Sequence, residues 1–223
     1  MKWFTSVSFS ICMLGWIAGC QGQTKPGVAN VHGDQLVGGG CDGCELMYVD
    51  MPAIIAATDT SPGWKEAGQK LLIKGKLFKI DGKTPALNVV IYYWQTNTKG
   101  YYEPSAGMPQ KARPHGHIRG WVKTDSEGNY AIYTIKPGAY PAKDFAAHIH
   151  TSIKEPDVAN EYYIDEFVFD DDPLLTSAKR KAADNRGGSG ILKPIMQDGL
   201  LIANHDIVLG LKIPGYPSAD LSK

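Results

Sequence analysis

Two histidines separated by one residue are the feature of this sequence with the clearest capacity for chemistry. His148 and His150 flank Ile149 in the segment Ala147-His-Ile-His150. On a strand both imidazoles would lie on one face, because successive side chains point to opposite faces. Two neutral imidazoles placed together can bind a first-row transition metal. A polar face of an edge strand is the alternative interpretation of the same pattern.

A second histidine pair has the same spacing in a different context. His115 and His117 flank Gly116, and Pro114 comes directly before them. Proline and glycine in these positions are typical of turns and loops. We therefore expect this pair to lie in a solvent-exposed loop that leads into a strand, and not to bind a metal.

The first twenty residues have the features of an export signal. Lys2 supplies a positive charge, and residues 3–17 form an apolar stretch too short for a stable membrane-spanning helix. The stretch ends in Ile17-Ala-Gly-Cys20, which resembles the lipobox of bacterial lipoproteins, in which the cysteine is acylated and becomes the new N-terminus. An ordinary secretory signal with an incidental Cys20 is the alternative.

From this segment we expect residues 1–19 to be a lipoprotein signal peptide and residues 20–40 to be a flexible tether, since the latter are polar and rich in glycine. The protein would then be attached to the bacterial cell envelope on the extracytoplasmic side, at the outer membrane or the periplasmic face. The lipid on Cys20 would be its only contact with a membrane.

Cys41 and Cys44 are the cysteines that remain once Cys12 leaves with the signal and Cys20 carries a lipid. In an extracytoplasmic compartment, two cysteines this close are expected to form a small disulfide loop. A redox-active dithiol is an alternative, although no βαβ pattern surrounds the pair. A zinc site would need a second pair of ligands, which His32 alone does not provide.

Composition describes one ordinary globular domain. The chain has 223 residues, with 23 Lys and Arg against 23 Asp and Glu, so its formal net charge is zero. This balance argues against a nucleic-acid-binding surface or a polybasic membrane patch. Hydrophobic residues make up 43% and charged residues 21%, as in folded domains and unlike disordered chains. We expect a single domain over residues 41–223.

The residue pattern predicts a mainly β fold. Alternating or β-branched segments separated by turn residues are typical of short strands. We expect a β-sandwich of mostly antiparallel strands with long loops and one short helix, at 174–184. The strand candidates are residues 73–77, 87–95, 121–124, 129–135, 148–153, 162–169 and 205–213.

Four segments in order resemble the intradiol ring-cleavage dioxygenases, the catechol and protocatechuate enzymes. They are Trp94-Gln-Thr-Asn-Thr-Lys-Gly-Tyr-Tyr102, Gly120-Trp-Val-Lys-Thr-Asp-Ser-Glu-Gly-Asn-Tyr130, Thr134-Ile-Lys-Pro-Gly-Ala-Tyr-Pro141 and Ala147-His-Ile-His150. With weaker similarity on both sides, the resemblance covers roughly residues 65 to 216. It implies a secreted or lipoprotein-type member of that family, with a non-haem Fe(III) cofactor.

The resemblance implies that the iron ligands are Tyr102, Tyr140, His148 and His150, the two tyrosines being also catalytic. Its spacing of a glycine and one further residue selects Tyr102 over Tyr101. Fe(III) is hard and highly charged, so anionic phenolate oxygens suit it. The implied reaction is cleavage of a catechol-type aromatic by dioxygen to a cis,cis-muconate-type dicarboxylic acid, with both oxygen atoms retained.

The sequence departs from the family pattern around the expected substrate pocket. Phe145 stands where many members have an arginine, and Arg113, Arg119 or Lys143 could substitute for it from elsewhere. Glu166 stands where the family has a glutamine, and its negative charge would disfavour carboxylated catechols. We therefore expect Phe145, Glu166 and Arg119 to be substrate-pocket residues.

Two further interpretations stay open at this point. Because the usual arginine is missing, the chain could be an inactive surface-anchored β-sandwich module that binds catechols. The histidines could also hold copper or zinc. No long N-terminal helical region of the kind that dimerises the cytoplasmic catechol enzymes is evident, which favours a monomer or a different oligomer.

Overall fold

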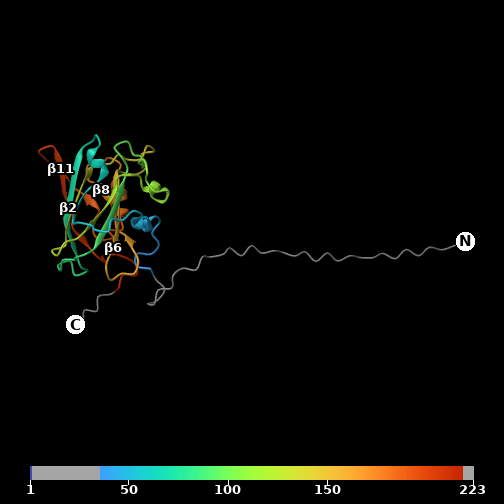
Figure 1. Ribbon diagram of the computed structural model, residues 1–223, viewed down its shortest axis with the longest axis horizontal. Helices are drawn as coiled ribbons and strands as arrows, with labels where there is room; N and C mark the ends of the chain where they lie inside the picture. Colours follow the sequence, from blue (N-terminus) through green and yellow to red (C-terminus); the bar gives the residue numbers. More distant parts are fainter. Residues whose placement is uncertain (2–35, 218–223) are drawn as a thin grey trace. The chain divides into compact units, whose positions relative to one another are not determined.

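The strands form two six-stranded sheets in the computed structural model, which describes Met1 and residues 36–217 (Figure 1). One sheet has the order β1-β5-β2-β11-β10, with β12 also paired to β2. The other has the order β4-β3-β6-β8-β9, with β7 also paired to β6. Six of the ten strand pairings within the described residues are antiparallel, which confirms a mainly β, mostly antiparallel sandwich.

The bounds of the elements follow in sheet order. The first sheet contains β1 (Thr58–Thr60), β5 (Asn129–Ile135), β2 (Lys70–Phe78), β11 (Leu200–Asn204), β10 (Ile195–Gln197) and β12 (Ile207–Val208). The second contains β4 (Arg119–Lys123), β3 (Val90–Gln95), β6 (His148–Lys154), β8 (Phe167–Phe169), β9 (Ile191–Leu192) and β7 (Tyr162–Tyr163). The helical segments are α1 (Ser177–Ala182) and the 3₁₀ helices η1 (Cys44–Tyr48), η2 (Pro62–Lys65) and η3 (Gln110–His115).

The core lies between the two sheets and follows the period-two pattern of the strands. Ile73 of β2 and Ile132 of β5 are fully buried on one side, and they belong to one cluster with Ile91, Ile149 and Phe167 of the other sheet. In β3 and β6 the odd-numbered residues therefore face the core. The even-numbered residues face away from it, because neighbouring side chains alternate between the two faces.

The outer face of the second sheet is also covered, and this covered face carries the chemistry. Tyr92 and Trp94 of β3 form a second buried cluster with Met47 of η1. Trp121 of β4 is held beneath the same segment, since its indole Nε1 donates to the carbonyl of Met47 at 2.7 Å. The even-numbered side chains of β3 and β6 thus lie in a layer enclosed between the sheet and its covering loops.

The predicted elements agree with the structure in the central strands and differ from it near the C-terminus. The expected strand at 162–169 is divided into β7 and β8, and the one at 205–213 is only the two-residue β12. Gly210 and Lys212 have φ values of 75° and 54°, a left-handed backbone that ends a strand. The predicted helix at 174–184 is the shorter α1, capped by Thr176. Strands β1, β9, β10 and β11 were not predicted.

The last residues of the expected tether belong to the folded domain. Val37 is buried in the core, and the side-chain amide of Asn160 donates to its carbonyl at 2.9 Å. The amide of Gly38 donates to the carbonyl of Pro214 at 2.7 Å. The domain therefore begins before Cys41, and the predicted boundary lies too late. The expected signal peptide and the predicted lipidation site at Cys20 fall outside the described residues.

Helices are short throughout the part of the chain that the structure describes. None of them combines the length and the apolar character that crossing a lipid bilayer requires.

Candidate metal centre

Strand β6 presents both histidines of the first pair on the outer face of the second sheet. Its antiparallel pairing with β3 places Trp94 opposite His150, and its pairing with β8 places Val168 opposite His148. Because β6 and β8 are antiparallel and Ile149 lies opposite Phe167, the next pair in the same register is His150 and Glu166. His150 therefore lies between an indole ring on one strand and a carboxylate on the next, whereas His148 has an apolar neighbour.

Two loops bring tyrosines over the same face. Tyr102 follows β3 and Tyr140 follows β5, and these loops touch where each has a glycine. A Cβ on Gly100 would lie 2.0 Å from the carbonyl oxygen of Ala139, and one on Gly138 would lie 2.4 Å from that of Thr98. Only glycines allow this approach. The sequence thus fixes where the two tyrosine-bearing loops meet.

The four side chains converge on one point. The hydroxyl oxygens of Tyr102 and Tyr140 are 2.9 Å apart, and the Nε2 atoms of His148 and His150 are 3.2 Å apart. Tyr140 Oη lies 3.0 Å from His148 Nε2 and 3.4 Å from His150 Nε2. Tyr102 Oη lies 2.8 Å from His150 Nε2. Tyr101, the neighbour that a one-residue slip would have selected, is 52% exposed and outside this cluster.

The orientation of the imidazoles fits a bound cation. His148 Nδ1 donates to the carbonyl of Ala146 at 2.7 Å, and His150 Nδ1 donates to Glu166 Oε1 at 2.9 Å. In the neutral rings both Nε2 atoms therefore carry lone pairs, and two lone pairs that face each other at 3.2 Å cannot form a hydrogen bond. A metal with bonds of about 2.0–2.1 Å would separate adjacent ligand atoms by about 2.9–3.4 Å. The donor set thus fits a transition metal.

Burial favours the neutral forms of Tyr102, Tyr140 and His148 when no metal is bound. It raises the pKa of Tyr102 well above its usual value, and the hydrogen bond with Tyr140 adds to this. Burial also raises the pKa of Tyr140 and lowers the pKa of His148. Each hydroxyl can then donate to one Nε2. A metal bound here would have to displace both phenol protons.

Glu166 lies behind His150 and not among the four converging atoms. His148, His150 and Glu166 together form the cluster of potential metal ligands with donor atoms within 4.8 Å of one another. The Glu166 carboxylate, however, contacts Nδ1, on the far side of the ring from Nε2. Burial alone would raise the pKa of Glu166, but the hydrogen bond from His150 and the nearby imidazoles lower it overall. The carboxylate is thus an anionic partner of a ligand candidate.

A cleft of about 390 Å³ opens beside His148 and Glu166. Its walls are largely apolar and include Phe145, Val168 and Ile191. The Phe145 ring is 55% exposed and packs edge-on to Tyr140 at 6.3 Å between centroids. Two of the three expected substrate-pocket residues, Phe145 and Glu166, therefore line one cavity next to the histidines.

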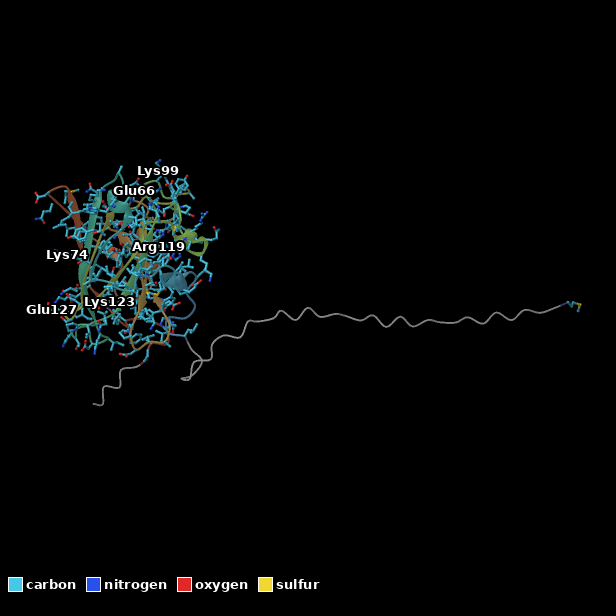
Figure 2. The ribbon with its side chains drawn as sticks, in the orientation of Figure 1. Glu66, Lys74, Lys99, Arg119, Lys123 and Glu127 are labelled. Carbon is cyan, nitrogen blue, oxygen red and sulfur yellow. A yellow bond between two sulfur atoms is a disulfide. The ribbon has the colours of Figure 1, made fainter. Side chains whose placement is uncertain are left out.

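Arg119, the third expected pocket residue, lies elsewhere. Its guanidinium donates to the carbonyls of Leu46 and Val49 at 3.4 and 3.0 Å and to the Tyr92 hydroxyl at 3.3 Å. The side chain, labelled in Figure 2, is buried against the backbone of η1. Arg119 is not among the residues lining the cleft. The expectation that it reaches the substrate is wrong because those carbonyls already hold its donors.

The cation next to Phe145 is Lys179 of α1, which sequence reasoning did not select as a pocket residue. Its Nζ lies 5.5 Å from the centre of the Phe145 ring and donates to the carbonyl of Asp144. It lines the same cleft as Phe145. In the sequence, Lys179 is one of three consecutive basic residues on a short helix, a pattern typical of a solvated face.

The second histidine pair differs from the prediction at His115. This residue is buried, accepts a 2.8 Å hydrogen bond from the Tyr92 hydroxyl at Nδ1, and stacks on Trp94 at 4.1 Å. Trp94 in turn stacks on His150 at 4.8 Å. Burial lowers the pKa of His115 to about 3, so this ring stays neutral. The expected exposed loop is therefore wrong for His115, which supports the site from behind. Tyr92 and Trp94 on one face of β3 indicate an aromatic layer, but no local signal in the sequence places His115 against it.

The structure joins the two cysteines for which the sequence analysis expects a disulfide. Cys41 and Cys44 are joined, with their Cα atoms 5.6 Å apart. The bridge closes the turn that leads into η1, and η1 covers the Tyr92–Trp94 cluster. The two cysteines thus help to hold the cover of the outer face in place.

Comparison with known proteins identifies relatives of one kind. The family model described as "Dioxygenase" matches residues 48–186. The chain is 31% identical over 114 residues to the protocatechuate 3,4-dioxygenase beta chain of Burkholderia cepacia, covering 48% of each chain. It is 28% identical over 107 residues to catechol 1,2-dioxygenase 2 of Acinetobacter lwoffii, covering 45% of this chain and 37% of that one. The chain thus matches about half or less of these relatives' length.

Solved structures show the same fold. The dioxygenase domain of a dioxygenase and carbohydrate-binding fusion from Streptomyces sp. SirexAA-E superposes with a TM-score of 0.52 at 20% identity, covering 72% of this chain and 94% of that one. Catechol 1,2-dioxygenase from Acinetobacter sp. ADP1 gives a TM-score of 0.51 at 20% identity, covering 72% of this chain and 61% of that one. At this level of identity the likeness concerns the fold alone.

Proposed function

Since the chain belongs to the dioxygenase family that contains the catechol and protocatechuate ring-cleaving enzymes, we propose that it is an Fe(III)-dependent intradiol dioxygenase. The proposed reaction opens a catechol-type ring with dioxygen to give a cis,cis-muconate-type product. The observation that carries the proposal is the convergence of two phenol oxygens and two imidazole Nε2 atoms, with both Nδ1 atoms bonded away from the centre.

The chain's own groups would hold the iron and handle the substrate protons. Bound Fe(III) would supply a Lewis acid that activates the aromatic diol toward dioxygen. His148 and His150 would contribute neutral nitrogens, and Tyr102 and Tyr140 would contribute phenolates. Tyr140 is the phenol that contacts Phe145 at the cleft. In the proposal, Tyr140 Oη accepts a proton from a catechol hydroxyl, so that Tyr140 acts as the general base.

The cleft beside His148 is the proposed substrate site. A cleft of about 390 Å³ is within the range of small-molecule pockets and exceeds the needs of a simple catechol. Phe145 would cover one face of the ring, and the apolar walls would exclude water from the reacting carbons. The residues that line the cleft also include three acidic ones and two basic ones, namely Asp165, Glu166, Asp184, Lys179 and Arg180.

Oxygen consumption with a panel of catechols tests this function. We expect iron-loaded protein to consume one dioxygen per catechol and to form a product with the ultraviolet absorption of a conjugated dicarboxylic acid. Tyr140→Phe should abolish turnover, while Tyr101→Phe, which changes an exposed neighbour, should retain it. Substrate binding without oxygen uptake by the iron-loaded protein would instead favour a non-catalytic catechol-binding module.

We also propose that the protein is attached to the extracytoplasmic side of a bacterial envelope through a lipid on Cys20. The support is the Ile17-Ala-Gly-Cys20 segment after a short apolar stretch. Expression of a Cys20→Ser variant should release the protein from the membrane fraction. Membrane association that is the same in this variant and in the unaltered chain would contradict the proposal.

A further inference from the structure

The two histidines of the site differ in what holds their second nitrogen. His148 Nδ1 donates to a neutral backbone carbonyl, that of Ala146, at 2.7 Å. His150 Nδ1 donates to the carboxylate of Glu166 at 2.9 Å. Either acceptor fixes the ring so that Nε2 points toward the tyrosines. Of the two acceptors, only the carboxylate carries a charge. A charged acceptor at Nδ1 increases the electron density of the imidazole and makes its Nε2 a stronger metal ligand.

Glu166 is held firmly in this contact. The register of β6 and β8 sets its side chain beside His150, and Glu166 directly precedes the fully buried Phe167. A Cβ on Gly190 would lie 2.1 Å from the Glu166 carbonyl oxygen, so the residue that precedes β9 packs directly against this backbone. The Glu166 side chain is 30% exposed. The register and packing of the strands therefore determine the position of Glu166, which is not a freely moving surface side chain.

In the described part of the chain, no lysine or arginine forms an ion pair with this carboxylate. Among the ion pairs within residues 36–217, the one that includes Glu166 is with His150, and none joins it to a lysine or arginine. The negative charge therefore acts on the metal centre through the imidazole that it contacts. Together with two phenolates it brings the chain's contribution to three negative charges.

We propose that Glu166 is a positioning residue that makes this centre selective for a trivalent over a divalent metal ion. Three negative charges from Tyr102, Tyr140 and Glu166 match a 3+ ion without help from a bound anion. With a 2+ ion the same set leaves an uncompensated negative charge in a partly buried place, which is unfavourable. The inference rests on the proposed function in one respect, since it requires a metal at the four converging atoms.

Glu166→Gln isolates the charge from the hydrogen bond. The amide oxygen of glutamine has the same reach and still accepts from His150 Nδ1, so the ring should keep its orientation. Glu127→Gln is the matched control, because Glu127 lies in the exposed turn between β4 and β5 (Figure 2) and its one ion pair among the described residues is with Lys76, at 3.9 Å. Both variants remove one negative charge from the whole protein.

The test compares the affinities of metal-free protein for Ga(III) and Zn(II), two redox-inert ions that differ in charge. Each ion is supplied as a chelate of known stability, and binding is followed by tyrosine absorbance. We expect Glu166→Gln to reduce the preference for Ga(III) over Zn(II) by about tenfold to a hundredfold, the range typical of second-layer partners. Glu127→Gln should leave the preference within about twofold, as expected for a distant exposed charge.

A second readout uses iron itself. Loss of the charge should raise the Fe(III)/Fe(II) reduction potential of the loaded protein, by about 59 mV for each tenfold loss of preference. An unchanged Ga(III)-to-Zn(II) preference in Glu166→Gln would overturn the role of Glu166 and leave the proposed function standing. Failure of the unaltered protein to bind Ga(III) or Fe(III) would overturn both.

Discussion

The protein contains two His-x-His segments whose side chains are arranged differently. In the first, His148 and His150 lie on a regular strand and direct both Nε2 atoms to one point, 3.2 Å apart. In the second, η3 ends at His115, and Gly116 follows with a φ of 64°. His115 then turns inward onto Trp94, whereas His117 turns outward to the Glu103 carbonyl and the Glu66 carboxylate.

The difference shows that the backbone between two potential ligands decides whether they can share an ion. An extended residue between them keeps both side chains on one face, while a left-handed glycine sends them apart. The two histidines of the second pair therefore contact different partners, His115 the aromatic layer and His117 the Glu103 carbonyl and the Glu66 carboxylate. The following predictions extend this comparison, in order of decreasing expected effect.

Replacing one histidine of the first pair should have the largest effect. We expect His150→Ala to lower metal affinity by more than about a hundredfold, beyond the loss typical of outer partners, and to abolish oxygen uptake. His117→Ala should keep both properties, because His117 has the same spacing but no path to the centre. Metal content and turnover that survive in His150→Ala would remove the distinction between the pairs.

Replacing one tyrosine tests the oxygen half of the donor set. Fe(III)-loaded protein should show a phenolate-to-iron charge-transfer band in the visible range, giving a red-brown colour. Tyr140→Phe should weaken and shift this band, and Tyr101→Phe should leave it as it is, because Tyr101 is exposed and outside the cluster. Equal spectra in the two variants would show that Tyr140 does not contact the metal.

Metal binding should become tighter as pH rises. The pKa values of Tyr102 and Tyr140 are raised, so both phenols hold their protons near neutral pH, and His148 is neutral because its pKa is lowered. Binding that releases two protons gains up to about a hundredfold in apparent affinity per pH unit. Competition with a chelator between pH 6 and pH 8 measures this, after correction for the chelator. An affinity independent of pH would contradict phenolate ligation.

His115→Ala should cost stability without removing the metal. It leaves the buried Tyr92 hydroxyl without its acceptor and opens the stack on Trp94, a loss of about 2 kcal/mol in the free energy of unfolding. Urea unfolding and metal content measure the two effects separately. If His115→Ala lost as much bound metal as His150→Ala, His115 would have to be part of the metal centre.

The same residue should contribute to acid sensitivity. The pKa of His115 is lowered to about 3 by burial, while an unfolded histidine has a pKa near ~6.5. Between these two pKa values, His115 is protonated in the unfolded chain but not in the folded protein. The free energy of unfolding therefore falls as the pH decreases from the unfolded pKa toward the folded one. His115→Phe, which keeps a stacked ring, should lose this part of the pH dependence.

The smallest effect is expected at His117. Burial opposes protonation, but contacts with the Glu103 carbonyl and the Glu66 carboxylate raise its pKa overall. The contribution of this contact to the free energy of unfolding is complete at pH values below the pKa that His117 has in the unfolded chain. It is lost as the pH rises through the raised pKa that His117 has in the folded protein. For a partly exposed pair we expect less than about 1 kcal/mol, so His117→Gln should unfold almost normally at pH 8.

The central strands and the first histidine pair could be predicted because both depend on local periodicity. Tyr102 and Tyr140 could be selected only through the family resemblance, since tyrosines in loops have no period. Once the loops are seen to meet at Gly100 and Gly138, their convergence has a steric reason. The disulfide could be predicted from the short spacing of Cys41 and Cys44 together with the export signal, which indicates an oxidising compartment.

What could not be predicted depends on contacts between distant segments. The pairing of Glu166 with His150 requires the register of two strands, and the place of Lys179 over Phe145 requires the packing of a short helix. His115 was assigned to an exposed loop because the neighbouring Pro114 and Gly116 dominate the local pattern. The aromatic layer that buries it comes from another strand, so no local signal identifies its partner.

X-ray absorption spectroscopy of the Fe(III)-loaded protein, combined with metal analysis, tests the central claim most directly. Four side chains that share one ion predict one iron per chain, with two imidazoles and phenolate oxygens as its nearest neighbours. The signal from one imidazole should disappear in His150→Ala and persist in His117→Ala. A spectrum without imidazole scattering, or one that His150→Ala leaves unchanged, would contradict a shared metal site.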